Sequence, residues 1–379
     1  MEKRLLDQKT AGMSRYYGLD LLRIVAALYV AILHILGLGG VCDAAQPGTV
    51  QYAISWFMQM WVYCAVNIFA LISGYVGFTQ EQKRYNFGNI LVLWLQVVVL
   101  SVAVKLVAVL ICPDSLSLPG LIRMCMPVTA NTYWYFTSYC ALFFVIPLLN
   151  SAVRNSSRLQ LRRVFAVLIC LFSLYSTLGD RWRLANGFSF LWLTVLYLLG
   201  AIMKKCSFGS GLSSKAVCLG IAVCNVLSVL CKLWENKHGF LLGHSLVEQT
   251  YLAPTHLLGA MLHIVLFSRL KLTQRQKKWL SVAAPGAFAV YILNCHPVIM
   301  ENMITDRFAH LAEASLPVLI LWILGFSAMF VMVSLAIDWL RRKLFELLKV
   351  KLLADKLMNK AATAVDYVTC RWFAGLNEN

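Results

Sequence analysis

Charged residues are scarce in this chain, and acidic residues are the scarcest. Only 13% of its 379 residues are charged, with 17 Asp and Glu against 34 Lys and Arg, whereas 60% are apolar. Soluble globular proteins average about 25% charged and about 45–50% apolar residues. With a mean hydropathy of +0.71, the composition excludes a soluble domain and a disordered chain. Twelve cysteines, mostly within apolar runs, are too few for a disulfide scaffold. We therefore expect a membrane protein.

Several motifs are also missing. The first apolar run lacks a small-residue cleavage site, so we expect no cleavable signal peptide. There is no internal repeat or inverted duplication, which argues against many secondary transporters, and no nucleotide-binding glycine loop. The cysteines lack zinc-ligand spacing, and His256 and His263, seven residues apart, would lie about 10 Å apart on a helix. We expect no metal site.

Apolar runs long enough to cross a bilayer dominate the sequence. A spanning helix needs about 20 mainly apolar residues, with its backbone hydrogen bonds satisfied within the segment. We expect an all-α, multi-pass membrane protein with a basic leader (1–16), a ten-helix domain (17–340) and a basic amphipathic tail (341–379). The ten spans are expected near residues 17–38, 52–77, 87–111, 133–149, 162–179, 188–203, 214–233, 250–268, 281–300 and 315–340.

Basic residues alternate from one loop to the next. Under this ten-span assignment, with Arg162, Arg163 and Lys215 at the span ends counted with the adjoining loops, 26 Lys and Arg fall on the face that holds both termini, five fall on the opposite face and three fall within spans. The positive-inside rule then predicts cytoplasmic termini in the cell membrane. The net charge of +17 is thus a topology signal, and we expect no nucleic-acid partner. The tail is expected to lie on anionic lipid or, alternatively, to bind a partner helix.

The first expected span carries two ionisable side chains, Arg23 and His34, in the stretch LDLLRIVAALYVAILH. The eleven residue-to-residue steps from Arg23 to His34, at 100° each, make three helical turns plus about 20°. Both side chains therefore lie on one face of the helix, about 16 Å apart along its axis. That length is similar to an extended pantetheine arm. Arg23 could bind the phosphates of a cytoplasmic acyl-CoA while His34 takes a proton from a hydroxyl. Alternatively, Arg23 pairs with Asp20 and His34 is a hydrogen-bonded core residue.

Other candidates are expected at the same depth. The ninth span places Tyr291 and His296 near the outer side, and Lys105 in the third span also falls in the outer half, where a lysine is costly outside a polar cavity. Trp134 and Tyr135 open the fourth span, as an interfacial aromatic belt or as a sugar-stacking platform.

A Ser-Gly pair, Ser73 and Gly74, stands at the inner end of the second span. It could kink the helix or allow close helix packing. Alternatively, it lets a ligand phosphate approach the backbone.

Taken together, these residues resemble the acyltransferase-3 group of integral membrane acyltransferases. That family has an acidic residue, an arginine and then a histidine in its first span, matched here by Asp20, Arg23 and His34. The other matches are Ser73–Gly74–Tyr75 at the end of the second span, Trp134–Tyr135 at the start of the fourth, and a late tyrosine–histidine element. The last resembles Tyr291 to His296, with a wider spacing than the commonest form.

The resemblance implies transfer of an acyl group, often acetyl, from cytoplasmic acyl-CoA to a hydroxyl of an extracytoplasmic polysaccharide or glycan. Acyl-CoA would be a co-substrate, with no permanently bound cofactor. We expect His34 to be the general base or a transient acyl carrier. Arg23, Asp20, Ser73 and Gly74 are expected to bind the donor. Tyr135, Trp134, Lys105, Tyr291 and His296 are expected to bind the acceptor or stabilise charge.

Two alternatives remain open from the sequence. One is a transporter or flippase of the polysaccharide pathway, which would equally explain ionisable groups at membrane depth. The other is a non-enzymatic sensor or subunit of a polysaccharide machine, in which His34 would be dispensable.

Overall fold

The computed structural model describes residues 15–81, 86–111, 118–240 and 243–374, and every regular element within these ranges is helical. The expectation of an all-α protein is therefore confirmed. Most of the expected basic leader, the loop residues Lys83 and Arg84, and residues 375–379 of the expected tail lie outside the described residues.

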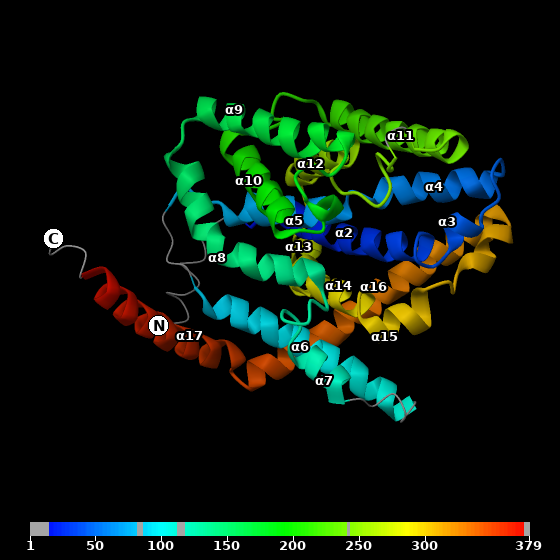
Figure 1. Cartoon of the computed structure of the whole chain (residues 1–379). Helices are drawn as coiled ribbons and strands as arrows, with labels where there is room; N and C mark the ends of the chain where they lie inside the picture. Colours follow the sequence, from blue (N-terminus) through cyan, green and yellow to red (C-terminus); the bar gives the residue numbers. More distant parts are fainter. Residues whose placement is uncertain (1–14, 82–85, 112–117, 241–242, 375–379) are drawn as a thin grey trace.

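The helices form a bundle in which α2, α4, α9 and α11 run in roughly the same direction, with α3 at one end and α17 near the other (Figure 1). In chain order they are α2 (Tyr17–Leu36), α3 (Val41–Ala44), α4 (Val50–Val62), α5 (Ala65–Gly77), α6 (Gly88–Ile111), α7 (Leu118–Cys125), α8 (Trp134–Asn155), α9 (Arg158–Ile169), α10 (Phe190–Cys206), α11 (Ser214–His238), α12 (Pro254–Ser268), α13 (Gln274–Ala283), α14 (Ala287–Asn294), α15 (Pro297–Ile299), α16 (Leu316–Leu347) and α17 (Val350–Ala374).

Seven helical segments in the described part of the chain are long and apolar enough to cross a membrane. An eighth is the pair Gln274–Asn294 and Pro297–Glu313, which is bent by 63° at its break. All ten expected spans coincide with helical segments, but α10 has 17 residues and α12 has 15. By length and composition, the structure therefore supports seven to eight spans, and the count of ten and the cytoplasmic termini stay predictions.

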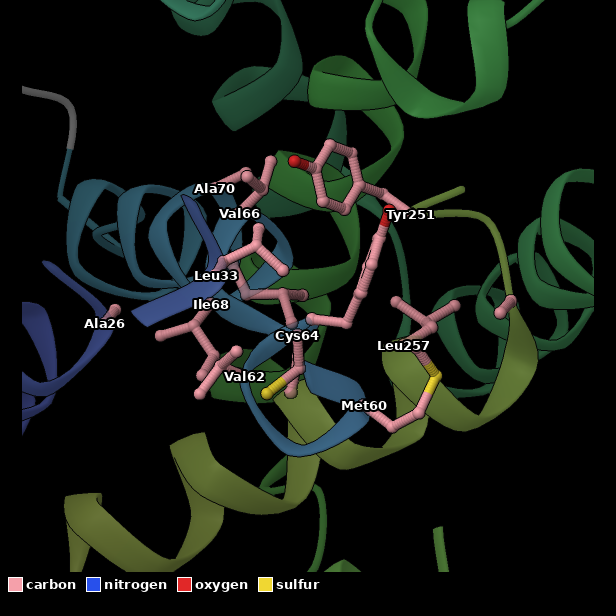
Figure 2. Packing of buried hydrophobic residues seen from close by; sticks show 14 of the residues in the cluster. Ala26, Leu33, Met60, Val62, Cys64, Val66, Ile68, Ala70, Tyr251 and Leu257 are labelled. Atoms are coloured by element: carbon pink, nitrogen blue, oxygen red, sulfur yellow. The ribbon is translucent and has the colours of Figure 1, made fainter. Parts of the chain in front are cut away.

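The core is built around α2, which contacts α4, α5, α12, α14 and α16. Figure 2 shows side chains of one buried cluster, which includes Leu33, Met60, Val66, Tyr251 and Leu257. Each of these residues is less than 9% exposed. Because helices surround α2 on several sides, its polar side chains face protein rather than lipid.

Helices α5 and α10 approach each other closely at two glycines. A Cβ added at Gly74 would collide with the backbone carbonyl of Tyr197, and one added at Gly200 would collide with the carbonyl of Leu71. Small residues allow such close approach between membrane helices. The space beside Gly74 is thus filled by α10, which favours the helix-packing interpretation of this glycine, and its donor-binding role stays a prediction.

The C-terminal helices extend beyond the expected end of the membrane domain. The helix α16 continues past residue 340 to Leu347, and α17 follows it and packs against α6. In the C-terminal part of α16, Asp338 is fully buried and forms ion pairs with Arg341 and Arg342. Gln96 on α6 donates to the same carboxylate at 3.2 Å.

Candidate active site

A cavity of about 690 Å³ lies next to His34, on the last turn of α2. This volume falls in the range of about 300–1,000 Å³ typical of small-molecule sites. The helix ends at Leu36, and the chain reverses through a glycine-rich segment in which Gly40 has a φ of +83°. The residues that follow this turn, Cys42 and Asp43, also line the cavity.

His34 is held by a partner far away in the sequence. Its Nδ1–H donates to Oδ1 of Asn294, the last residue of α14, which is 2% exposed. A proton on Nδ1 leaves the lone pair on Nε2 free. This ring nitrogen can therefore accept a proton from a group in the cavity. Asn294 is a positioning residue that the sequence analysis missed.

Three of the predicted aromatic residues meet on the wall of this cavity: Trp134, Tyr135 and Tyr291. The backbone N–H of Tyr135, in the first turn of α8, donates to the Tyr291 hydroxyl at 3.3 Å, and the two ring centres lie 5.8 Å apart. Trp134 lies nearly parallel to Tyr251, with ring centres 6.2 Å apart. The expected grouping of these residues near His34 is therefore present in the structure.

Acidic residues line the outer part of the cavity: Asp43, Glu248 and Asp306. Asp43 and Asp306 are exposed, so the cavity opens beside them. Burial raises the pKa of the Cys42 thiol, and the Asp43 and Glu248 carboxylates raise that pKa further. Cys42 therefore stays protonated at neutral pH and is a poor nucleophile.

Helix α11 positions the loop that carries Glu248. Its buried Glu235 accepts hydrogen bonds from the Ser245 hydroxyl and the Leu246 backbone N–H, both at 2.6 Å. Lys232, one turn earlier and 3% exposed, forms an ion pair with Glu248. Since a buried charge is costly without a partner, these contacts fix Glu248 at the cavity wall.

A second cavity, of about 300 Å³, surrounds Arg23 near the start of α2. Arg23 and Arg15 both pair with the carboxylate of Asp20 at 2.5 Å, and Asp20 is 4% exposed. The expected Arg23–Asp20 pair is thus present, and Arg23 lines the cavity as well. Two arginines share one carboxylate, so this group keeps a net positive charge.

A third cavity, of about 610 Å³, continues from the second toward the C-terminal ends of α5 and α8. Arg23, Ser73 and Tyr139 line both cavities. Arg154 also lines the third cavity, and its buried Nε has no hydrogen-bond partner among the described residues. An arginine at this position suits a phosphate group. The sequence analysis did not single out Arg154 as a candidate.

The Arg23 cavity and the His34 cavity adjoin. Phe69, Tyr135 and Phe288 line both of them, so these three rings form the partition between the two spaces. A chain of cavities therefore runs along α2, from Arg154 past Arg23 to His34. It begins at the end of the molecule where α2 starts and opens at the opposite end.

Two predicted site residues lie away from these cavities. His296 is fully buried: its Nε2–H donates to the Ser101 carbonyl at 3.1 Å and its Nδ1 accepts from the Val298 N–H at 3.2 Å. Both ring nitrogens thus bind the backbone at the break between α14 and α15. Neither His296 nor Lys105 lines any of the three cavities.

Metal ligands are not clustered in the described ranges, where no group of three or more His, Cys, Asp or Glu could hold an ion. The helices and their adjoining cavities define a multi-pass membrane protein with a row of internal cavities. A family model described as "Acyltransferase domain" matches residues 16–338, and the chain belongs to this acyltransferase-3 family. The chain is therefore a membrane acyltransferase. No curated protein and no solved structure matches it.

Proposed function

We propose that this enzyme transfers an acyl group, of which acetyl is the simplest, from cytoplasmic acyl-CoA to a hydroxyl of an extracytoplasmic glycan. The observation that carries the proposal is the adjoining pair of cavities, with Arg23 in one and His34 in the next. On this proposal, the end of the molecule where α2 begins faces the cytoplasm. The protein then resides in the cell membrane.

The donor would occupy the second and third cavities. The phosphates of CoA would meet Arg23, Arg15 and Arg154, whose planar guanidinium groups match phosphate oxygens and stay charged. Ser73 lines both cavities, and its hydroxyl donates to the Phe69 carbonyl at 2.9 Å, so its oxygen would accept from an N–H or O–H of the acyl donor. The pantetheine arm would pass the partition at Tyr135 and bring the thioester to His34.

The acceptor would enter from the opposite end. Nε2 of His34 takes the proton of the acceptor hydroxyl, and the hydroxyl oxygen attacks the thioester carbonyl. The C–S bond then breaks, the acyl group stays on the sugar oxygen as an ester, and the CoA thiolate receives the proton from His34. Asn294 keeps the required nitrogen of His34 unprotonated at the start of each cycle. Trp134, Tyr135 and Tyr291 would hold the sugar.

Membranes that contain the protein, incubated with labelled acetyl-CoA, test this proposal. We expect label in glycan, and we expect His34→Gln to lower the rate by about 10²–10⁴, as for removal of a general base. Arg23→Gln should raise the KM for acetyl-CoA. His310→Gln and Arg163→Gln, at exposed positions away from the three cavities, are the matched controls.

The same assay distinguishes the alternatives. A transporter would move glycan across the membrane without consuming acetyl-CoA. A non-enzymatic subunit would support labelling equally well with His34→Gln. Either result would overturn the proposed function.

A further inference from the structure

We propose that the His34 cavity takes an uncharged, hydroxyl-rich sugar unit and disfavours units that carry carboxylate, phosphate or sulfate. This inference rests on the proposed function and specifies its acceptor. Its basis is the charge of the cavity wall, one unpaired polar group, and the aromatic rings that line the space.

The cavity wall carries three carboxylates, of Asp43, Glu248 and Asp306, and in the described part of the chain no Lys or Arg lines it. Lys232 neutralises Glu248 from behind, which leaves Asp43 and Asp306. Arg307 follows Asp306 in the sequence but is exposed and outside the lining. Even at the dielectric constant of water, one carboxylate about 6 Å away weakens anion binding by about threefold.

Gln59 on α4 supplies a second, independent observation. Its side chain lines the cavity and is 5% exposed, yet its Oε1 has no hydrogen-bond partner among the described residues. A buried carbonyl oxygen without a donor is costly. A sugar hydroxyl can donate to it, whereas an ionised carboxylate or sulfate has no proton to give.

The rings on the wall favour the same class of acceptor. Phe188 lies with its ring centre 4.8 Å from those of both Trp134 and Tyr251, and Tyr63 packs against Tyr251 at 5.7 Å. The face of an aromatic ring is negative, so it attracts the polarised C–H groups of a sugar ring and repels an anion. The aromatic rings, the amide oxygen of Gln59 and the carboxylates on the wall therefore all favour the same acceptor, a neutral polyol.

The position of the ester in the native product is the first test. After labelling with acetyl-CoA, the glycan is cut into single sugar units and the acetylated unit is identified by mass spectrometry. We expect the ester on a unit without an acidic substituent. An ester on an acidic unit would overturn this inference and leave the proposed function standing, whereas absence of any ester would refute the proposed function itself.

A charge variant is the second test. In the Asp43→Asn, Asp306→Asn double variant, we expect an oligogalacturonate to inhibit acetyl transfer about tenfold more strongly than in the unmodified protein, since two threefold penalties are removed. Inhibition by the matched neutral oligogalactose should change far less. Glu301→Gln, at an exposed carboxylate outside the cavity, is the control. Equal inhibition by oligogalacturonate in the unmodified and double-variant proteins would overturn the inference.

Discussion

Replacing Asn294 by leucine tests how the orientation of His34 supports the reaction. Leucine has a similar size and preserves packing at this buried position, but it removes the oxygen that accepts from His34 Nδ1. This hydrogen bond exists only in the tautomer that leaves Nε2 free. Its loss therefore lowers the population of the productive tautomer and leaves the ring free to rotate.

The size of the effect follows from the hydrogen bond. A buried donor left without a partner costs about 1–3 kcal/mol, which corresponds to a factor of about 5–150 in the productive population. We expect kcat of Asn294→Leu to fall by about that factor, while the KM for acetyl-CoA stays the same because Arg23 is untouched. The loss should be smaller than the about 10²–10⁴ expected for removing His34.

The assay is transfer of label from acetyl-CoA to glycan, normalised to the amount of folded protein. Asn294→Asp keeps an acceptor oxygen and should retain more activity than Asn294→Leu. The control is Asn225→Leu, because Asn225 is 6% exposed and lies outside the His34 cavity. An unchanged kcat in Asn294→Leu, or an equal loss in Asn225→Leu, would refute the positioning role.

Three further predictions follow from the structure. Arg154→Gln should raise the KM for acetyl-CoA about tenfold with little change in kcat, since a hydrogen bond to a charged group contributes about 1.5–3 kcal/mol. Steady-state kinetics would measure this, and an unchanged KM would contradict it. Gly74→Ala should lower the Tm of the detergent-solubilised protein by several degrees, because the added Cβ collides with α10. Gly325→Ala, in open space on α16, is the control and should leave Tm unchanged or raise it. Equal Tm values in the two variants would count against this packing. His296→Ala should lower Tm, because two hydrogen bonds to the backbone are lost. The kcat of the folded variant should stay within about threefold of the unmodified protein. A kcat loss as large as that of His34→Gln would instead show that His296 takes part in the reaction.

The sequence alone was sufficient to predict the helical segments and to place Arg23 and His34 on one face of the same helix. A long apolar run admits only one regular structure in a membrane, and helical periodicity then fixes which side chains share a face. Tyr135 and Tyr291, 156 residues apart, were also placed near each other correctly, because spans that end at the same depth bring their terminal residues to one level.

Contacts between distant helices could not be read from the sequence. Asn294 was missed as the partner of His34, although an amide side chain within the apolar stretch AVYILN was an available signal. His296 and Gly74 have the residue types of a site, yet both ring nitrogens of His296 bind backbone groups and Gly74 packs against α10, so their binding roles stay predictions. Whether a neighbouring helix already fills the space beside such a residue depends on packing, and no local pattern encodes that.

The partition of three rings has a consequence for the membrane itself. Chambers that reach from one end of the bundle to the other would be a route for ions if they merged, and an energised membrane cannot hold its voltage across such a leak. Phe69, Tyr135 and Phe288 are the shared boundary of the two chambers. Under the proposed function, electrical insulation along this path would depend on this aromatic layer, which would have to admit a slender thioester arm and still exclude hydrated ions.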